Sequence, residues 1–208
     1  MNKSVKLANK VKIETIIKNL EKRNMKGYYC ETAEEAKAKA LSLIGDEDVV
    51  SWGGSETVVE LGIKSALKKV IDRDAAAPED FMKVRREALL CDVFLTSTNA
   101  ITMDGELVNI DGTGNRVAAM CFGPNRVIVI AGVNKIVRDE ESAIKRIKTE
   151  ACPPNCIRLN RDTPCARTGK CGNCLPKDQS ICSYTVTTRM SGIPDRIHVI
   201  LVNENLGF

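Results

Sequence analysis

The sequence predicts an α/β fold built on a mostly parallel, buried β-sheet with one β-hairpin element. Three observations predict it. Short apolar segments alternate with helical patterns along most of the 208 residues, as in proteins built from β-α-β units. Residues 126–131 (RVIVIA) and 196–202 (RIHVILV) are almost wholly apolar, which is typical of strands covered on both faces. Asp104-Gly105 separates two apolar segments, which indicates a tight hairpin.

The chain begins with a helix, a strand and a second helix. Apolar residues at helical spacing predict the first helix over 9–24, and residues 28–31 form a short strand. Thr32 and Glu35 have the spacing of a capping box, which predicts a second helix over 33–44.

The next elements are shorter and are separated by glycine and proline. Residues 48–52 (DVVSW) predict a strand that leads directly into Gly-Gly-Ser and a helical pattern over 56–67. A short strand over 70–72 and a helix over 79–91, which begins after Pro78, follow.

From residue 92 the pattern changes. Residues 93–97 predict a strand, and 101–103 with 106–110 predict the two arms of the hairpin. The glycine-rich turn DGTGN leads into a helix over 116–122, and residues 139–149 form a charged helix.

A cysteine-rich insertion over 150–183 precedes the last strand. It is too polar and too rich in proline and glycine to form a core of its own, so we expect a metal-stapled insertion within a single domain over 1–208. No internal repeat is visible.

Composition excludes several classes of protein. The net charge of +4 comes from interspersed charges of both signs, and aromatic residues make up only 4% of the chain, so we expect no nucleic-acid surface. The longest apolar run, 127–133, is far shorter than the roughly 20 residues of a membrane helix, and the first residues, MNKSVKLANK, lack the apolar core of a secretory signal. We therefore expect a cytoplasmic protein without a membrane segment.

Two glycine-rich segments are candidate ligand-binding loops. In WGGSET a strand turns into a helix, and the exposed amides at such a turn suit a phosphate or carboxylate; the alternative is a tight turn without a ligand. Residues 96–115 gather many short polar side chains near strand ends, where open α/β sheets bind ligands. The alternative is that Asp104-Gly105 and Asp111-Gly112 are only turns; for Asp104 alone a turn is the favoured interpretation, and for the whole segment a ligand site is. Lys135 follows a buried strand and could meet the anion, or it is an ordinary surface lysine. The candidate binding residues are Gly53, Gly54, Ser55, Thr57, Asn99, Thr102, Asp104, Gly105, Asn109, Gly112, Thr113, Asn115 and Lys135.

Catalytic candidates are few. Glu56 and Glu106 are possible nucleophiles or bases, or else solvated or capping carboxylates. The one histidine, His198, lies in an apolar strand and is interpreted as a core residue, so a serine or cysteine triad is disfavoured. Neither a P-loop nor the GxGxxG nicotinamide fingerprint is present.

The cysteines predict a metal or cluster. Of the nine in the chain, Cys165, Cys171, Cys174 and Cys182 follow the spacing C-x5-C-x2-C-x7-C, which can wrap a zinc ion or a 4Fe–4S iron–sulfur cluster. Free thiols or a disulfide are the alternative. Whether Cys152 and Cys156 join the site is open.

Taken together, these segments resemble the lactate-utilisation (LUD) domain family. The resemblance rests on DVVSWGGSETVVELGI, the block from LTSTNAITMDGELVNIDGTGN to VNKIV, TPCARTGKCGNC and RIHVILVNENLGF. It implies a Rossmann-like three-layer fold of the type found in ribose-5-phosphate isomerase, glucosamine-6-phosphate deaminase and the CoA transferases. It also implies that the WGGSET loop holds a small anion, and that the chain resembles the short, single-domain members of the family.

Three functions follow as hypotheses. By resemblance, the first is an accessory or subunit of lactate (2-hydroxy-acid) oxidation that binds a small anionic ligand beside iron–sulfur partner proteins. The second is a stand-alone isomerase- or CoA-transferase-like enzyme that uses Glu56 or Glu106. The third is a non-catalytic ligand-binding scaffold with structural zinc. The oligomeric state is left open, and a homo-oligomer is one possibility.

Overall fold

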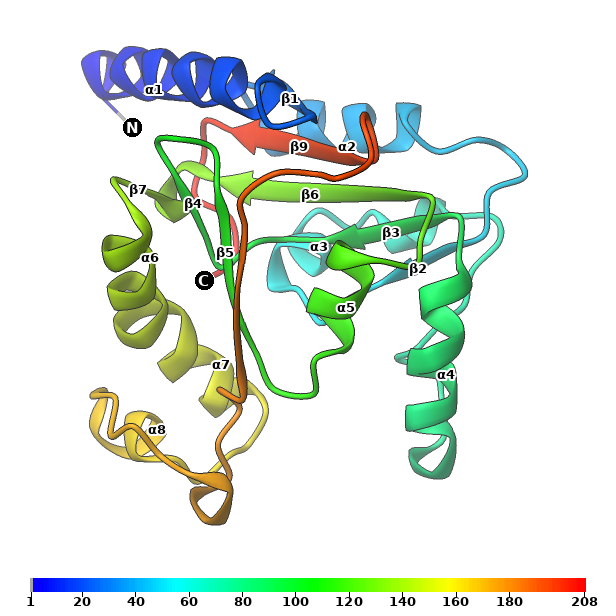
Figure 1. Cartoon of the computed structure of the whole chain (residues 1–208), viewed down its shortest axis with the longest axis vertical. Coiled ribbons are helices and arrows are strands. Elements are labelled where there is room, and N and C mark those ends of the chain that lie inside the picture. The colour runs from blue at the N-terminus through cyan, green and yellow to red at the C-terminus, as the bar shows by residue number, and fades with distance from the viewer. Residues whose placement is uncertain (1) are drawn as a thin grey trace.

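A five-stranded parallel sheet forms the centre of the molecule in the computed structural model, which describes residues 2–208 (Figure 1). The strands lie in the order β1-β9-β6-β3-β2. Their bounds are Met25–Cys30 (β1), Ile197–Val202 (β9), Arg126–Gly132 (β6), Val93–Thr96 (β3) and Val50–Trp52 (β2). The predicted α/β fold with a mostly parallel, buried sheet is confirmed.

The two strands that the sequence shows as apolar runs occupy the middle of this sheet. β9 pairs with β1 on one side and with β6 on the other, over six residues each time. In β6, Val127 and Val129 contribute to one hydrophobic cluster while Ile128 and Ile130 contribute to another. Because side chains alternate along a strand, these two clusters lie on opposite faces of the sheet.

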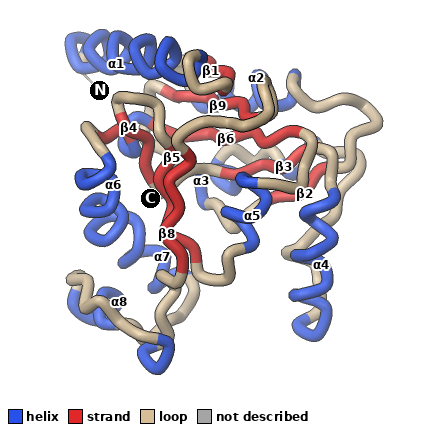
Figure 2. Tube along the Cα trace, in the orientation of Figure 1, coloured by secondary structure: helices blue, strands red, loops and turns tan. Residues whose placement is uncertain are grey.

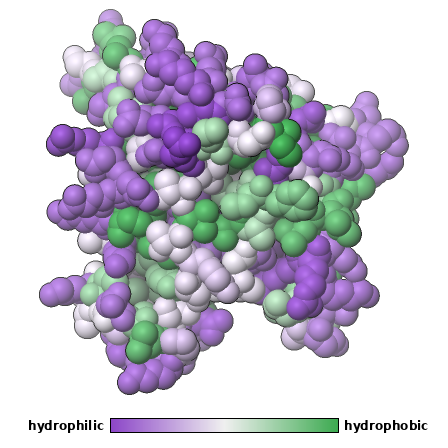
Figure 3. Space-filling model, viewed as in Figure 1, coloured by the Kyte–Doolittle hydropathy of each residue, from purple (hydrophilic) through white to green (hydrophobic). Residues whose placement is uncertain are grey.

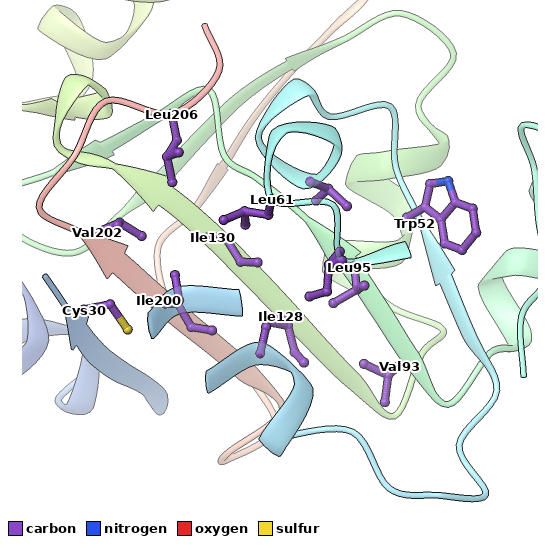
Figure 4. Packing of buried hydrophobic residues seen from close by; sticks show 14 of the residues in the cluster. Cys30, Trp52, Leu61, Val93, Leu95, Ile128, Ile130, Ile200, Val202 and Leu206 are labelled. Atoms are coloured by element: carbon purple, nitrogen blue, oxygen red, sulfur yellow. The ribbon is translucent and has the colours of Figure 1, made fainter. Parts of the chain in front are cut away.

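Helices cover both faces. α1 (Lys3–Glu21) packs on one face through Ile13, Ile16 and Leu20. On the other face lie α2 (Ala33–Ser42) and α3 (Glu56–Glu60), with the sheet residues that Figure 4 shows pointing into the same cluster. Thr32 caps α2 as predicted, since its side chain accepts a hydrogen bond from the amide of Glu35 at 3.2 Å.

A second, four-stranded sheet lies beside the first, in the order β7-β4-β5-β8 (Figure 2). The predicted hairpin forms its middle, and Gly105 at the turn has a φ of +84° that favours glycine. The outer strands β7 and β8 are not predicted by the sequence. The bounds are Ile136–Val137 (β7), Ala100–Thr102 (β4), Leu107–Asp111 (β5) and Tyr184–Thr188 (β8).

The cysteine-rich segment is partly helical. α6 (Glu140–Arg146) continues through a π-helical turn into α7 (Cys152–Arg158), and α8 (Pro164–Thr168) follows; Figure 1 shows these helices stacked along one side. The side chains of Ala151 and Cys152 pack with residues of β4 and β5. The first part of the predicted insertion therefore covers the second sheet rather than standing apart from it.

Two expected elements are shorter than the sequence suggests. The helix over 56–67 ends as α3 at Glu60, because Gly62 adopts a φ of +56°. The strand over 70–72 is reduced to a single bridge between Val50 and Val70. The remaining helices are α4 (Phe81–Glu87) and α5 (Asn115–Cys121).

The result is a three-layer arrangement: α2 and α3, the parallel sheet, and then α1 with the second sheet and its helices. On the face drawn in Figure 3, polar residues dominate the outer lobes and apolar ones gather across the middle. None of the helices within residues 2–208 has the length and apolar character needed to cross a membrane.

Candidate functional site

A cavity of about 260 Å³ opens where the parallel strands end. Gly54 follows β2, Ser97 follows β3 and Lys135 follows β6, and all three line the cavity. The carboxyl ends of neighbouring parallel strands meet at one edge of a sheet, which is where open α/β sheets form ligand crevices. The site therefore lies where the topology of the sheet directs it.

The Gly-Gly-Ser turn forms one wall. Ser55 is the N-cap of α3, because its side chain accepts a hydrogen bond from the amide of Val58 at 3.4 Å. A Cβ atom at Gly53 would lie 3.1 Å from the side chain of Arg116, and one at Gly54 would lie 3.2 Å from the guanidinium of Arg73. The two glycines permit close approach of arginines, and neither adopts the positive φ that such a turn could have required.

A buried arginine holds the second wall together. The guanidinium of Arg116 donates to the side chains of Asn99 and Asn109 and to the backbone carbonyls of Ser97 and Ile110. Its Nε lies 3.5 Å from a carboxylate oxygen of Asp111, at the end of β5. These bonds occupy the guanidinium, so Arg116 positions the loops after β3 and β5 and places a fixed positive charge beside the cavity.

Lys135 lies at the inner end of the site. It is only 4% exposed, and its Nζ donates hydrogen bonds to Thr57 Oγ1 at 2.8 Å and to Ser97 Oγ at 2.9 Å. Burial, and to a smaller extent the nearby guanidinium groups of Arg146 and Arg116, lower the pKa of Lys135 to about 7, while the carboxylate of Glu60 opposes this shift weakly. The surface-lysine interpretation is wrong, because the side chain is enclosed.

The lining is strongly cationic. Six basic side chains and two carboxylates line it: Arg73, Arg85, Arg116, Lys135, Arg158 and Arg161 against Glu56 and Asp111. Glu56 pairs with Arg158 at 3.2 Å, which joins α3 to α7 across the cavity. Among residues 2–208, Arg85, Arg161 and Lys135 have no carboxylate within 4.0 Å. The Nε of Arg73 is buried without a hydrogen-bond partner, and it lies 3.4 Å from a carboxylate oxygen of Asp74, which is outside the lining.

The structure brings most of the candidate residues to this cavity. Eight of them line it: Gly54, Ser55, Glu56, Asn99, Gly112, Thr113, Asn115 and Lys135. Three more lie directly behind the lining and contact residues that form it: Gly53, Thr57 and Asn109.

The other four candidates lie together at the tip of the hairpin, outside the lining. Arg23, just after α1, donates to the backbone carbonyl of Asp104 and pairs with Glu106 at 3.4 Å. Thr102 Oγ1 accepts from the amide of Glu106, and Gly105 packs against the end of α1. These residues shape the turn and dock it on α1, which is a structural reason for their presence.

Sequence reasoning did not find the arginines of the site. Arg116 follows the DGTGN turn directly, so its position beside a ligand loop was a usable signal. Arg73, Arg85, Arg158 and Arg161 come from helices and loops whose sequences have no motif. Only the packing of α4 and α7 beside the sheet edge brings them together.

Below the cavity lie four thiols, here called the thiol cluster: Cys152, Cys156, Cys165 and Cys182. The Sγ atoms of Cys152 and Cys182 are 3.5 Å apart, and those of Cys156 and Cys165 are 3.7 Å apart. The cluster shares Cys165 and Cys182 with the predicted metal ligands, while Cys171 and Cys174 make no contact with it that the structure records in residues 2–208. The hydrogen bond between Cys152 and Cys182 raises the pKa of the first thiol and lowers that of the second.

The fold and the cavity define a three-layer α/β protein with a cationic crevice at the carboxyl ends of its parallel strands. The LUD domain matches residues 13–202, and the chain belongs to the LUD domain family, which is associated with lactate utilisation. It is similar to the crystal structure of a DUF162 family protein from Deinococcus radiodurans, with a TM-score of 0.56 and 14% identity over 94% of this chain and 98% of that one. That likeness shows a shared fold. No curated protein sequence matches the chain.

Proposed function

We propose that this protein binds a small organic anion in the cavity and serves lactate (2-hydroxy-acid) utilisation in the cytoplasm. Its role is that of an accessory or subunit beside iron–sulfur partner proteins. Membership of the LUD domain family supports the connection to lactate. One observation carries the choice of an anion: six basic side chains line the cavity against two carboxylates.

The pairing of these charges supports the same conclusion. Glu56 and Asp111 each already face an arginine, Arg158 and Arg116 respectively. Arg73 faces Asp74, which lies outside the lining. Arg85, Lys135 and Arg161 have no ion-pair partner among residues 2–208, so solvent or a ligand must balance them, and a charge-assisted hydrogen bond to a carboxylate or phosphate is among the stronger ones that proteins make. Arg73 is the best anchor, because its guanidinium lies over Gly54 in the lining, and its Nε makes no hydrogen bond although it lies 3.4 Å from a carboxylate oxygen of Asp74.

Isothermal titration calorimetry of the full chain with L-lactate, pyruvate and inorganic phosphate tests the proposal. We expect saturable binding of at least one of the three anions, weakened about 10-fold in Arg73→Met, which corresponds to about 1.4 kcal/mol. Arg138→Met is the matched control, because the side chain of Arg138 is 90% exposed and lies outside the cavity. Absence of binding for all three anions, or equal affinities in Arg73→Met and the wild type, would contradict the anion site.

A second candidate function is a stand-alone isomerase- or CoA-transferase-like enzyme with Glu56 as base or nucleophile. The position of Glu56 in the cavity lining favours it over Glu106, which lies at the hairpin tip. Glu56→Gln should then abolish turnover of a substrate without lowering the melting temperature. Arg158→Met removes the ion pair but keeps the carboxylate, so activity in this variant separates a chemical role of Glu56 from its role as an anchor.

We further propose that the thiol cluster holds a metal centre, either zinc or a 4Fe–4S cluster. In support, a tetrahedral zinc site with Zn–S bonds of ~2.3 Å places sulfur atoms ~3.8 Å apart, close to the two pair distances here. No three metal-ligating side chains within the described residues yet converge on one point, so binding requires the two pairs to draw together. Zinc would act as a structural clamp on the insertion, and an iron–sulfur cluster would be an electron relay.

A further inference from the structure

Lys135 has an environment that anion binding alone does not require. Its buried amine contacts Thr57 of α3, Ser97 in the loop after β3 and the C-terminal segment near Gly207, and the residue lines the cavity. No carboxylate forms an ion pair with it among residues 2–208. Glu60 favours the ammonium ion from a greater distance, but Arg146 and Arg116 each disfavour it more strongly. A lysine that served only as an anchor for an anion would gain from staying charged, and this one is held toward neutrality.

The hydrogen bonds around the amine of Lys135 show that the amine donates to both neighbouring hydroxyl groups. Thr57 Oγ1 donates its own hydrogen to the carbonyl of Leu206, and Ser97 Oγ donates to the carbonyl of Thr98. Both hydroxyl oxygens are therefore acceptors toward Lys135. A neutral amine has two hydrogens, and these two acceptors take both, which leaves the nitrogen lone pair free.

From this geometry we infer that Lys135 is a nucleophilic amine that forms an imine with the carbonyl carbon of a 2-oxo acid bound in the cavity. The inference rests on the proposed anion site, because the same cations hold the carboxylate. In a 2-oxo acid the carboxylate is bonded directly to the carbonyl carbon, so an anchored carboxylate brings that carbon to an adjacent amine. A lowered lysine pKa in a desolvated site beside another cation is the usual way in which such amines are activated.

The step balances without an oxidant or reductant. The nitrogen of Lys135 forms a bond to the carbonyl carbon, and one amine proton passes to the carbonyl oxygen to give a carbinolamine. The hydroxyl group then leaves as water with the second amine proton, and the lone pair on nitrogen forms the C=N bond. Water in the open cavity carries the protons between these atoms.

Reductive trapping tests the inference. The full chain is incubated with pyruvate and sodium cyanoborohydride, which adds hydride to an imine and leaves a stable secondary amine, and the modified residue is located by peptide mass spectrometry. We expect one dominant adduct, on Lys135, at a rate that increases from pH 6 to pH 8 because the amine loses its proton near pH 7. Adducts on surface lysines should form at least 10-fold more slowly in this range.

Two variants complete the test. Lys135→Met should remove the dominant adduct, while Lys145→Met, which changes an exposed lysine on α6, should leave it unchanged. Peptide mapping of the wild type gives the answer even where Lys135→Met is poorly folded. Labelling that is spread evenly over surface lysines overturns the inference. If pyruvate binds in calorimetry and Lys135 stays unmodified, the imine is overturned while the anion site stands.

Discussion

At the scale of single residues, two cations of the site, Arg116 and Lys135, are buried, which is unfavourable for a charge unless partners stabilise it. The buried charge of Arg116 is stabilised by hydrogen bonds to two asparagines and two backbone carbonyls and by an ion pair with Asp111. Lys135 has only two hydroxyl partners and no carboxylate among residues 2–208. Its charged form is therefore the less stable one in the folded state, which makes stability depend on pH.

The sign of that dependence follows from proton counting. Folding lowers the pKa of Lys135 from 10.5 to about 7, so between these values the unfolded chain binds more protons than the folded one. The contribution of Lys135 thus destabilises the wild type most at and below pH 7 and fades as the pH rises toward 10.5. Lys135→Met lacks this term, and its free energy of unfolding relative to the wild type should fall by up to about 1.4 kcal/mol per pH unit across this window.

Urea unfolding at several pH values between 6.5 and 10 measures this difference. Lys145→Met should follow the wild type throughout, since its side chain is exposed. A constant difference between Lys135→Met and the wild type over this range would show that Lys135 keeps the same charge in the folded and unfolded chain.

The role of a single residue was predictable where its cause lies in the neighbouring sequence, and not where its cause is a contact with a distant segment. Ser55 as a helix cap follows from local chemistry, since a serine between a glycine turn and a helical pattern has few other uses. The need for glycine at Gly53 and Gly54 comes instead from Arg116 and Arg73, which are distant in sequence. Likewise, the sequence alone could not show which residues of 96–115 lie at the hairpin tip and which line the cavity, because this depends on the three-dimensional path of the chain.

At the scale of elements, the cysteine-rich segment is a helix–loop–helix unit rather than an unstructured insertion. Cys152 and Cys156 are four residues apart in α7, so they lie on the same face of that helix. α8 brings Cys165 to that face, and the loop before β8 brings Cys182. Spacing alone favoured Cys171 and Cys174 as metal ligands over Cys152 and Cys156. It could not show that α7 places the latter two thiols on one face.

Metal and acid-labile sulfide analysis of anaerobically purified protein tests the metal proposal. We expect one equivalent of zinc, or about four each of iron and sulfide, per chain. Cys156→Ser should lose the metal and lower the melting temperature, because structural metal binding is coupled to folding. Cys121→Ser, which changes an exposed thiol in α5, is the matched control.

The same experiment distinguishes the two ligand sets. Metal retained in Cys171→Ser and Cys174→Ser but lost in Cys152→Ser and Cys156→Ser supports the thiol cluster. The reverse pattern would assign the metal to the spacing motif. Protein without metal, whose stability a chelator leaves unchanged, would make the segment a metal-free cap on the second sheet.

The outer strands of the second sheet show another limit of local reasoning. β7 is two residues long and is separated from β6 by the single 3-10 turn Val133–Lys135. β8 follows the cysteine-rich segment, and three of its five residues are threonines. Their pairing with β4 and β5 is set by the hairpin, which offers two open edges. The hairpin itself was predicted, because Asp-Gly between two apolar segments favours the tight turn that joins antiparallel strands.

At the scale of the whole molecule, the last strand in sequence lies in the interior of the parallel sheet, between β1 and β6. β9 hydrogen-bonds to β1 and to β6, and all six of its residues are buried. The apolar character of β9 is visible in the sequence, but its position in the sheet is not, since the strand order depends on connections between distant segments. The two hydrophobic clusters on the opposite faces of the sheet both include residues of β9, so neither is complete without it.

Two truncations follow from this placement. Removal of residues 197–208 deletes the interior strand β9 and separates β1 from the rest of the sheet, so this fragment should lack cooperative thermal unfolding and should expose its apolar surface to a dye. Removal of residues 204–208 keeps β9 and costs mainly the burial of Leu206, worth about 2 to 3 kcal/mol. The shorter truncation should therefore fold, with a lower melting temperature.

The shorter truncation also connects the fold to the site. Leu206 accepts the hydrogen bond from Thr57, Gly207 lies close to the amine of Lys135, and Phe208 lines the cavity. Without this segment, water reaches Lys135, its pKa returns toward 10.5, and trapping by pyruvate at pH 7 should slow at least 10-fold while β-sheet circular dichroism is retained. Unchanged trapping in the truncated, folded chain would show that the C-terminal segment does not control the environment of Lys135.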